Sequence, residues 1–424
     1  MMRILLPGDA DYAERVRALT ERQAAVPPEV AERAREIVSD VRARGDAAVR
    51  EWTLRLEQRE LPTFEVPRID WERAARALPA DVLRAIERAG GRIRAFHERW
   101  REQGFETSEP GIRLGLRVEP LARVGLYAPG GTARYPSTVL MTALPARVAG
   151  VEEIVLTTPG PSPETLAAAR VAGVDRVLAL GGAQAVAALA YGTESVPRVD
   201  KIVGPGNLYV AAAKRIVFGD VAIDSIAGPS EILILADDAA DPRAVAADLL
   251  AQAEHDTAAY PVLVTPSDVL AAAVVREVEK QLASLPRREI AQGALAAHGT
   301  CVVTAGLSAA LEFANAFAPE HLELMVRDPR ALWPQVKTAG ACFLGGYTPE
   351  PVGDYFAGPN HVLPTGGSAR WSSPLGCWDF VRRSTMIEYD RAALAAQAGD
   401  ISRLAKVEGL QAHARAVAIR FEEP

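Results

Sequence analysis

The sequence predicts an α/β protein with two consecutive parallel-sheet domains and small helical segments at its N and C termini. Short β-rich runs alternate with Ala-rich helical stretches from about residue 123 onward, and the same alternation starts again after residue 230. A chain of 424 residues is also too long for one ordinary core. Strands that alternate with helices build parallel sheets, so two similar α/β domains are expected to follow one another.

The first α/β domain is predicted over residues 121–230. Its five candidate strands are short and rich in aliphatic residues, as buried parallel strands are. Helical stretches at 163–173 and 183–192 lie between them. The candidate strands are VGLYA (124–128), EEIVLTT (152–158), DRVLAL (175–180), DKIVG (200–204) and DVAID (220–224).

The second α/β domain is predicted over residues 231–371. A Gly-Pro pair at residues 228–229 marks the boundary, and we expect a crevice at this junction. Helical stretches at 241–256 and 308–317 separate five further candidate strands. These are EILILAD (231–237), PVLVTPS (261–267), TCVVTAG (300–306), HLELMV (321–326) and ACFLGG (341–346).

The two ends of the chain do not follow this alternation. Residues 1–20 are assigned to a separate N-terminal segment. Residues 21–120 carry long Arg/Glu-rich helical periodicity and are expected to pack with the second α/β domain. The tail, residues 372–424, is predicted as loop followed by short helices. In its last helix His413 shares one face with apolar residues at i, i+3, i+4 and i+7 spacing, so we expect His413 to point toward protein.

Composition and charge exclude several classes of protein. The formal charge of -7 and the pI near 5.6 provide no basic footprint for nucleic acid or an anionic membrane. The first apolar stretch is too short for a signal peptide, and no run approaches the roughly 20 apolar residues that cross a bilayer. A soluble, cytoplasmic protein is therefore expected. Its three cysteines are odd in number and form no CxxC pair, which argues against a disulfide framework and a thiolate zinc site.

A polar pair lies near the end of the predicted helix 241–256. Asp241 is a good N-cap and Pro242 suits the first helical position, so the register of the helix is well defined. In that register Gln252 and His255 are one turn apart, on or beside the buried face. Two interpretations stay open, because either hydrogen bonds to a loop or a bound metal would satisfy both side chains.

A carboxyl group and an imidazole open the predicted strand at residues 321–326. Pro319 disfavours a helical Ala318, so Glu320 and His321 are held on a constrained turn. Such a pair can divide acid and base catalysis, although a surface pair at a strand end would have the same sequence. Ligands of open α/β sheets usually gather at the carboxyl ends of strands, whereas this pair lies at the start of one.

The segment 347–367 holds eight Gly or Pro residues around Asp354 and His361. This composition predicts a long, rigidly turned loop, which can carry a site or serve as an ordered connector. Two other histidines, His97 and His298, have no acidic or amide neighbours of this kind and are interpreted as surface residues.

The direct sign of nucleotide binding, a G-x-G-x-x-G motif, is missing from the sequence. Three side chains nevertheless follow the carboxyl ends of candidate strands in the first domain: Tyr127, Gln184 and Asn207. The GGAQ and GPGN turns also precede helices whose N-terminal amides could take phosphate oxygens. Gly-rich turns of this type occur without ligands as well.

Eight segments in order resemble the histidinol dehydrogenase family, from about residue 20 to 420. The resemblance implies two incomplete, duplicated Rossmann-like domains. The segments are YAPGGTARYPSTVLM, GGAQAVAALAYGT, VGPGN, GPSEILILAD, AQAEHD, APEHLEL, GDYFAGPNHVLPTGG and LQAHARAV.

The resemblance also implies a set of site residues. One zinc ion per subunit would be bound by Gln252, His255, Asp354 and His413. Substrate contacts would come from Ser230, His361 and Glu408 in addition to the zinc ligands and His321. NAD would contact Tyr127, Gln184 and Asn207.

In the reaction that this family implies, His321 takes the hydroxyl proton of histidinol as hydride leaves for NAD. Glu320 then activates water on the aldehyde, and a second NAD completes the oxidation to histidine. The resemblance further implies a homodimer in which the exchanged C-terminal segment brings Glu408 and His413 to the partner's site.

Three other functions stay open at this point. A related zinc- and NAD-dependent dehydrogenase could act on another small polyol or amino alcohol. A zinc hydrolase could use Glu320 to activate metal-bound water without a nucleotide. A binding protein could hold a small molecule in the crevice between domains without turnover.

Overall fold

The structure is a computed structural model that describes residues 2–22, 26–130 and 134–422. Residues 131–133, part of the motif that begins at Tyr127, therefore lie outside the described residues. Contacts divide the chain into two units. The larger unit comprises Met1–Trp100 and Leu121–Phe380, and the smaller unit comprises Arg101–Pro120 and Val381–Pro424.

The first predicted domain contains a five-stranded parallel sheet with the strand order β6-β5-β4-β7-β8. Numbered along the chain, this is 3-2-1-4-5, the order of a doubly wound sheet without its sixth strand. Every strand coincides with a predicted run, which confirms the prediction. The strands are β4 (Arg123–Tyr127), β5 (Glu153–Thr157), β6 (Arg176–Leu178), β7 (Lys201–Val203) and β8 (Ala222–Ile223).

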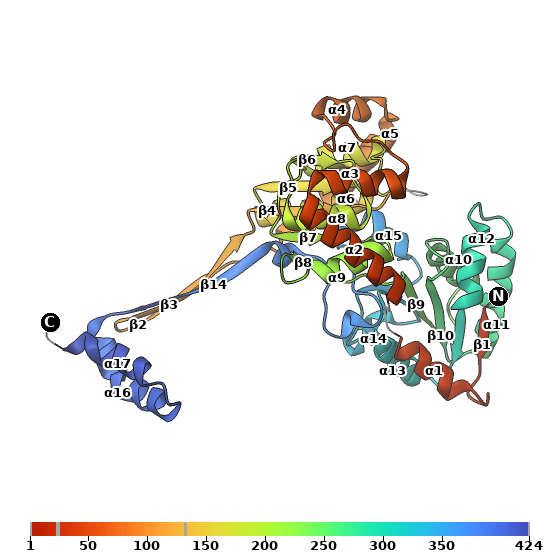
Figure 1. The fold of residues 1–424 in the computed structure, drawn as a ribbon. Helices are drawn as coiled ribbons and strands as arrows, with labels where there is room; N and C mark the ends of the chain where they lie inside the picture. Colours follow the sequence, from red (N-terminus) through yellow and green to blue (C-terminus); the bar gives the residue numbers. More distant parts are fainter. Residues whose placement is uncertain (1, 23–25, 131–133, 423–424) are drawn as a thin grey trace. The chain divides into compact units, whose positions relative to one another are not determined.

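The second predicted domain repeats this order in a six-stranded parallel sheet, β1-β11-β10-β9-β12-β13. Its last five strands again read 3-2-1-4-5, so the duplicated α/β fold is confirmed. The N-terminal strand β1 adds to the edge beside β11 (Figure 1). The strands are β1 (Arg3–Leu5), β9 (Glu231–Ala236), β10 (Tyr260–Thr265), β11 (Thr300–Val303), β12 (His321–Met325) and β13 (Ala341–Leu344).

Helices cover both faces of the six-stranded sheet. Ile232 and Ile234 of β9 pack in one core with α10 (Pro242–Ala253), α11 (Asp268–Leu282) and α12 (Arg288–Ala297). The alternate residues Leu233 and Leu235 pack in another core. Because side chains alternate along a strand, both faces of this strand must be apolar. The second core is completed by α1 (Tyr12–Thr20), α13 (Leu307–Phe317) and α14 (Pro329–Leu332).

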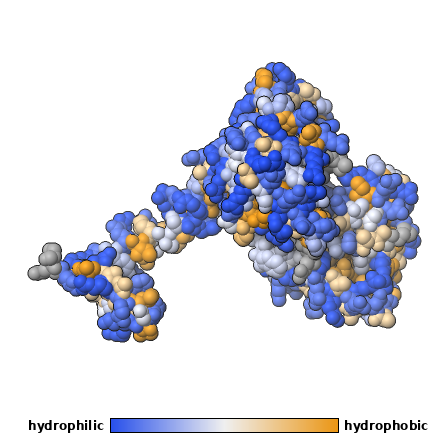
Figure 2. Space-filling view, in the orientation of Figure 1, coloured by the Kyte–Doolittle hydropathy of each residue, from blue (hydrophilic) through white to orange (hydrophobic). Residues whose placement is uncertain are grey.

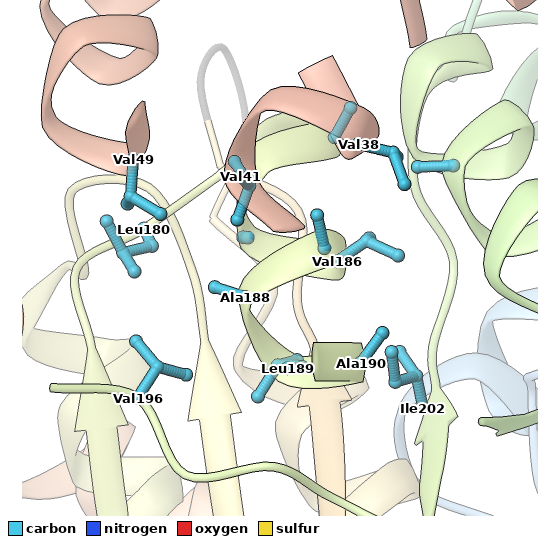
Figure 3. Packing of buried hydrophobic residues seen from close by; sticks show 14 of the residues in the cluster. Val38, Val41, Val49, Leu180, Val186, Ala188, Leu189, Ala190, Val196 and Ile202 are labelled. Atoms are coloured by element: carbon cyan, nitrogen blue, oxygen red, sulfur yellow. The ribbon is translucent and has the colours of Figure 1, made fainter. Parts of the chain in front are cut away.

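The five-stranded sheet carries two layers of helices on each face. The inner layers are α8 (Gly182–Tyr191) with α9 (Leu208–Val217), and α6 (Pro136–Ala149) with α7 (Pro163–Ala172). On the first face, Val38, Val41 and Val49 pack over Leu180 and Val186 (Figure 3). The outer helices are α2 (Pro28–Arg44), α3 (Asp46–Glu57), α4 (Arg68–Ala77) and α5 (Ala80–Glu98).

This packing differs from the expectation that residues 21–120 accompany the second α/β domain. Helices α2 to α5 cover the first domain instead, where they contact α6 to α9. The physical reason lies in α8, whose residues from Ala183 to Ala190 are all buried. A helix that is apolar on every side needs a further layer over its outer face, and α2 and α3 supply that layer.

The smaller unit is an antiparallel ribbon followed by two helices. Its sheet has the strand order β14-β3-β2, from Val381–Tyr389, Ile112–Pro120 and Phe105–Glu109. The tail was expected to hold only loop and short helices, but it contains strand β14 and the 17-residue helix α16 (Arg391–Val407) before α17 (Gln411–Ala418). Apolar residues lie on the surface of these helices (Figure 2). They include Leu404, Val407, Leu410 and Ile419.

The predicted loop at residues 347–367 contains one short helix, α15 (Glu350–Tyr355). Within the described part of the chain, no helix is long and apolar enough to cross a membrane. Short 3-10 helices occur at Trp333–Gln335, Ser368–Arg370, Cys377–Phe380 and Ile419–Phe421.

The interpretation of His97 as a surface residue is wrong. His97 is fully buried at the end of α5, against Phe96 and Trp100, and neither of its ring nitrogens has a hydrogen-bond partner. Burial lowers the pKa of His97 to about 4. His298 is only partly buried and stacks on Tyr260, with ring centroids 4.0 Å apart.

We predict that His97→Leu makes the protein less sensitive to acid. The unfolded chain binds a proton at His97 below a pH of about 6.5, whereas the folded chain does so only below about 4. Stability is therefore lost as pH falls through this window, by up to roughly 3 kcal/mol. Scanning calorimetry at pH 7 and pH 5 should give a smaller decrease in Tm for the variant than for the wild type. An equal decrease would contradict the prediction.

Candidate functional site

The residues predicted for chemistry in the larger unit meet at the amino ends of β9 and β12. His321, the first residue of β12, pairs in register with Ile232 of β9 and with Ala341 of β13. The end of α10 reaches the same edge of the sheet, since this helix runs antiparallel to the strands. The site therefore lies opposite the carboxyl edge at which open α/β sheets usually bind ligands.

The backbone of one residue, Glu231, holds both members of the predicted acid–base pair. The Glu231 N–H donates to Glu320 Oε2 at 2.8 Å, and the Glu231 carbonyl oxygen lies 3.0 Å from His321 Nδ1. A carbonyl oxygen can only accept, so Nδ1 carries a proton, and in the neutral form of His321 the free lone pair is on Nε2. His321 Nε2 is buried without a hydrogen-bond partner, 3.7 Å from Asp354 Oδ1.

The turn before this pair is conformationally restricted. Ala318 ends α13 in the left-handed region with φ +50°, which is uncommon for a residue with a Cβ. Pro319 follows, and Ala318 is not helical, as the sequence predicted. The chain leaves this turn with Glu320 and His321 both less than a tenth exposed. Local backbone strain is found at sites where surrounding structure fixes the position of functional groups.

Asp354 and His361 lie close to His321. The segment 347–367 therefore contributes side chains to the site, one of the two roles that the sequence left open for it. His361 Nδ1 lies 2.9 Å from the Asp354 carbonyl oxygen and 3.9 Å from its carboxyl group. The other ring nitrogen of His361 is 3.4 Å from the hydroxyl of Thr138 on α6. Asn360 donates to the Met141 carbonyl oxygen at 2.6 Å. These contacts join the segment to the first α/β domain.

Gln252 and His255 lie at the same site. Gln252 is fully buried, and with its amide nitrogen toward Glu350 it donates to the two carboxyl oxygens at 3.0 and 3.2 Å. This orientation is assigned from hydrogen bonding and leaves the amide oxygen free to accept or to bind a cation. His255, Glu350 and Asp354 each offer a ligand atom, and these atoms lie within 4.8 Å of one another.

The charge of this site favours a bound cation. Five carboxyl groups gather here, and within the described residues none of them forms an ion pair with Lys or Arg. Buried carboxylates without a cationic partner are unfavourable, and a divalent metal would compensate them. Oxygen and imidazole donors of this kind suit zinc. The carboxyl groups belong to Asp248, Glu320, Glu323, Glu350 and Asp354.

The pKa values reflect this crowding. Burial raises the pKa of Glu320 and of Glu350 to about 8. Burial lowers the pKa of His321, but the charges of Glu350 and Glu320 outweigh it and raise that pKa well above the usual range. Burial is the largest cause that lowers the pKa of His361 and of His255, and it outweighs the opposing charge of Asp354. A cation at this site would oppose the protonated forms of all these groups.

Sequence reasoning missed Glu350 and the carboxyl pair behind it. Glu350 is 2% exposed and lies 3.8 Å from His321 Nδ1. Its backbone N–H donates to Glu323 at 2.8 Å, and burial raises the pKa of Glu323 to about 9 and that of Asp248 to about 6. The spacing in the sequence could have indicated this carboxyl pair. Asp248 precedes Gln252 by one helical turn, and Glu323 follows His321 on the same face of its strand.

Two of the side chains predicted to contact a nucleotide are buried in the first domain. The Tyr127 hydroxyl accepts the Gly182 N–H at 3.0 Å, and burial raises its pKa to about 12. Gln184 donates to Glu57 at 3.0 Å, while its amide oxygen is buried without a partner. Both lie past the carboxyl edge of β4 and β6, near the point where the strand order reverses.

Asn207 is exposed and caps α9, and its side-chain oxygen accepts the N–H groups of Tyr209 and Val210 at 3.0 and 3.1 Å. The sequence left open whether the amides at the starts of α8 and α9 take phosphate oxygens. Tyr127 and Asn207 already accept some of them, because a helix N-terminus is satisfied by its own cap when one is available.

The remaining predicted residues are divided between the two units. Ser230 is partly buried directly before Glu231, at the start of β9. Glu408 and His413 lie in the smaller unit, and both are exposed. The expectation that His413 points toward protein therefore does not hold within the described chain, where His413 is exposed and the main contacts of α17 are with α16 and the last short helix.

Comparisons with known proteins cover almost the whole chain. The family model described as histidinol dehydrogenase matches residues 20–421. A histidinol dehydrogenase from Aquifex aeolicus (strain VF5) is 53% identical over 409 residues, 96% of each chain. A histidinol dehydrogenase from Syntrophotalea carbinolica is 49% identical over 430 residues, 100% of each chain. The crystal structure of histidinol dehydrogenase from Elizabethkingia anophelis matches with a TM-score of 0.92 and 33% identity, over 99% of this chain and 97% of that one.

We predict that Glu350→Gln weakens metal binding by roughly 10- to 100-fold, the usual effect of losing a partner that orients a ligand. A glutamine at 350 presents an N–H as well as an oxygen, so it no longer fixes which end of the Gln252 amide faces the metal. Competition between protein and a chromophoric chelator measures the affinity. Glu289→Gln, an exposed change on α12, is the control. Unchanged affinity in a folded Glu350→Gln protein would rule out this role.

Proposed function

The chain belongs to the histidinol dehydrogenase family and is an oxidoreductase, and from this premise we propose the reaction that it catalyses. It oxidises L-histidinol to L-histidine through histidinal, in a zinc-dependent, four-electron reaction linked to NAD. These are the last steps of histidine biosynthesis, and we propose that they take place in the cytoplasm. A dehydrogenase for a related polyol or amino alcohol remains the alternative that the same site could serve.

The observation that carries this proposal is the state of His321. Its Nδ1 is bonded to a peptide carbonyl, and its Nε2 is buried without a partner beside Asp354. A neutral imidazole in this tautomer is a general base for an alcohol proton. His321 takes the hydroxyl proton of histidinol, and in the second oxidation it takes the proton of the hydrated aldehyde.

Glu320 supports the second half of the reaction. Its carboxyl group accepts the Glu231 N–H through one oxygen, which leaves the other available to a water molecule. Burial raises its pKa to about 8, whereas the positive charge of a protonated His321 lowers that pKa. A larger fraction of Glu320 is therefore in the carboxylate form once His321 holds a proton. The carboxylate takes a proton from the water that adds to the aldehyde.

The residues that would hold zinc are Gln252, His255 and Asp354 of the larger unit and His413 of the smaller unit. Two imidazoles, one carboxylate and one neutral amide leave the ion with net positive charge, so it would anchor and orient the amino and imidazole nitrogens of the substrate. Ser230, His361 and Glu408 are proposed to complete the substrate contacts.

Two NAD molecules are proposed to accept one hydride each, next to Tyr127, Gln184 and Asn207. Their place at the carboxyl edge of the first sheet, where its strand order reverses, supports this assignment. The chain is also proposed to form a homodimer in which the smaller unit brings Glu408 and His413 to the partner subunit. Exposure of both residues, and of the apolar side chains on α16 and α17, supports this exchange.

The function is tested by the amount of NADH formed from histidinol by purified, zinc-loaded protein. We expect two NADH per histidinol consumed, loss of activity after treatment with EDTA, and recovery when zinc is added. NADH formation excludes a zinc hydrolase and a binding protein without turnover. A failure of zinc-loaded protein to oxidise histidinol would overturn the proposed substrate, and other amino alcohols and polyols would then be compared.

The two catalytic residues should separate the half-reactions. His321→Ala is expected to suppress oxidation of histidinol by at least roughly 100-fold while zinc stays bound, because general-base catalysis contributes about 10²–10⁴-fold. Glu320→Gln is expected to impair oxidation of histidinal much more than oxidation of histidinol. Each half-reaction is measured from its own substrate by NADH absorbance, and zinc content is measured for both variants.

Two outcomes would contradict these roles. Loss of zinc from His321→Ala would place His321 in metal binding and not in proton transfer. Equal impairment of both half-reactions by Glu320→Gln would show that Glu320 is not specific to the attack of water.

A further inference from the structure

Arg22 and Glu231 form a buried ion pair behind the catalytic residues. Arg22 Nε lies 2.7 Å from Glu231 Oε1, and Nη2 bonds to the second carboxyl oxygen. The side chains are 4% and 1% exposed. Gly366 adds its backbone N–H to Glu231 Oε1 at 3.1 Å. A bidentate pair of this kind fixes the relative orientation of the two side chains as well as their distance. Because buried ion pairs often add little net stability, stability alone does not explain this pair.

The same two residues hold both sides of the catalytic turn. The backbone of Glu231 bonds to Glu320 and to His321, as described above. Arg22 Nη1 donates to the carbonyl oxygen of Phe317 at 2.7 Å, directly before Ala318 in its left-handed conformation. The guanidinium carbon also lies 3.3 Å from the centre of the Phe317 ring. The Arg22 side chain therefore contacts both Phe317, which precedes the turn, and Glu231 of β9. The backbone of Glu231 in turn bonds to the two residues that follow the turn.

Arg22 also reaches this position from a distant part of the chain. Arg22 follows α1, which packs on α13 (Figure 1). Its Nη1 donates to the carbonyl oxygen of Leu19, near the end of α1, at 3.0 Å. Arg370 makes a parallel connection, since it donates to the carbonyl oxygens of Thr20 and Ala316. The N-terminal segment, the end of α13 and the loop at 366–370 thus meet around the Arg22–Glu231 pair.

We infer that the Arg22–Glu231 pair is a positioning device that holds Glu320 and His321 in their catalytic geometry and fixes the proton of His321 on Nδ1. This inference rests on the proposed function, because it assigns positions to the two residues that perform it. Neither Arg22 nor the Glu231 side chain touches the reacting atoms. The Glu231 peptide can orient His321 only while its strand end keeps its direction, and the ion pair maintains that direction.

The test compares Arg22→Met with the double variant Arg22→Met/Glu231→Met. The single change leaves a buried carboxylate unpaired and is expected to lower both Tm and kcat, the latter by roughly 10- to 100-fold with KM little changed. The double change removes both charges, so Tm should recover while kcat stays low. Recovery of kcat together with Tm would overturn the inference and leave the pair a purely structural role.

Two further measurements separate positioning from a loss of folded protein. With histidinol deuterated at the carbinol carbon, the isotope effect on kcat should rise in both variants, because a displaced base slows the chemical step. A smaller fraction of folded enzyme would lower kcat without changing that effect. Arg123→Met, which removes an Arg–Glu pair at the amino edge of the other sheet, is the control and should leave the isotope effect unchanged.

A substrate-free measurement distinguishes failure of this inference from failure of the proposed function. Nitrogen-15 NMR of histidine-labelled protein reports which ring nitrogen of His321 carries the proton, with His321→Ala used for assignment. In zinc-loaded protein, where the cation favours the neutral imidazole, we expect the proton on Nδ1 in the wild type and a mixture of tautomers in Arg22→Met. The same tautomer in both proteins would overturn the inference, whether or not histidinol is the substrate.

Discussion

The candidate site depends on the backbone of one residue, Glu231 at the start of β9. Its N–H and C=O point to neighbouring strand β12 in the ordinary ladder direction, but there they meet the side chains of Glu320 and His321. A backbone group cannot change its protonation or rotate independently of its strand. The acid–base pair is therefore attached to the most rigid element available, the centre of a six-stranded parallel sheet.

The two sheets share a strand order, but their proposed sites lie at opposite edges. In the five-stranded sheet the carboxyl edge between β4 and β7 carries Tyr127 and the Gly-rich turn at Gly204, whose φ of +115° and close approach to Tyr127 allow no side chain. At the equivalent place in the six-stranded sheet, Asp237 accepts the N–H groups of Arg327 and Ala239. The second site lies at the amino edge, so under the proposed function the usual rule for open sheets would apply to only one half of this duplicated fold.

Much of this architecture could be predicted from local pattern. All ten predicted strands form, and Asp241, Pro242 and Pro319 act as their types predict at helix ends and turns. Packing between distant segments could not be predicted in the same way. Helices α2 to α5 have ordinary amphipathic patterns that fit either domain, and only the complete burial of α8 shows which one needs them.

The site was predicted unevenly for a similar reason. His321, Asp354 and Gln252 were found because imidazole, carboxylate and amide groups stood out in turns or on an apolar face. Glu350 did not stand out, since a Glu between two prolines is typical of an exposed helix start. Its burial follows from tertiary contact with Gln252, which no local pattern encodes.

The distribution of charge supports the proposed completion of this site by a second subunit. The larger unit gathers carboxyl groups and imidazoles without a Lys or Arg partner among the described residues, so their burial is favourable only when a cation or protons compensate them. The smaller unit carries an exposed imidazole and a carboxyl group on helices whose apolar side chains are also exposed. The larger unit thus has buried carboxyl groups without a cationic Lys or Arg partner among the described residues. The smaller unit has apolar side chains that nothing in that unit covers. In the proposed dimer, assembly with a metal ion would satisfy both requirements at once, so that docking of the tail, metal binding and completion of the site would be thermodynamically linked.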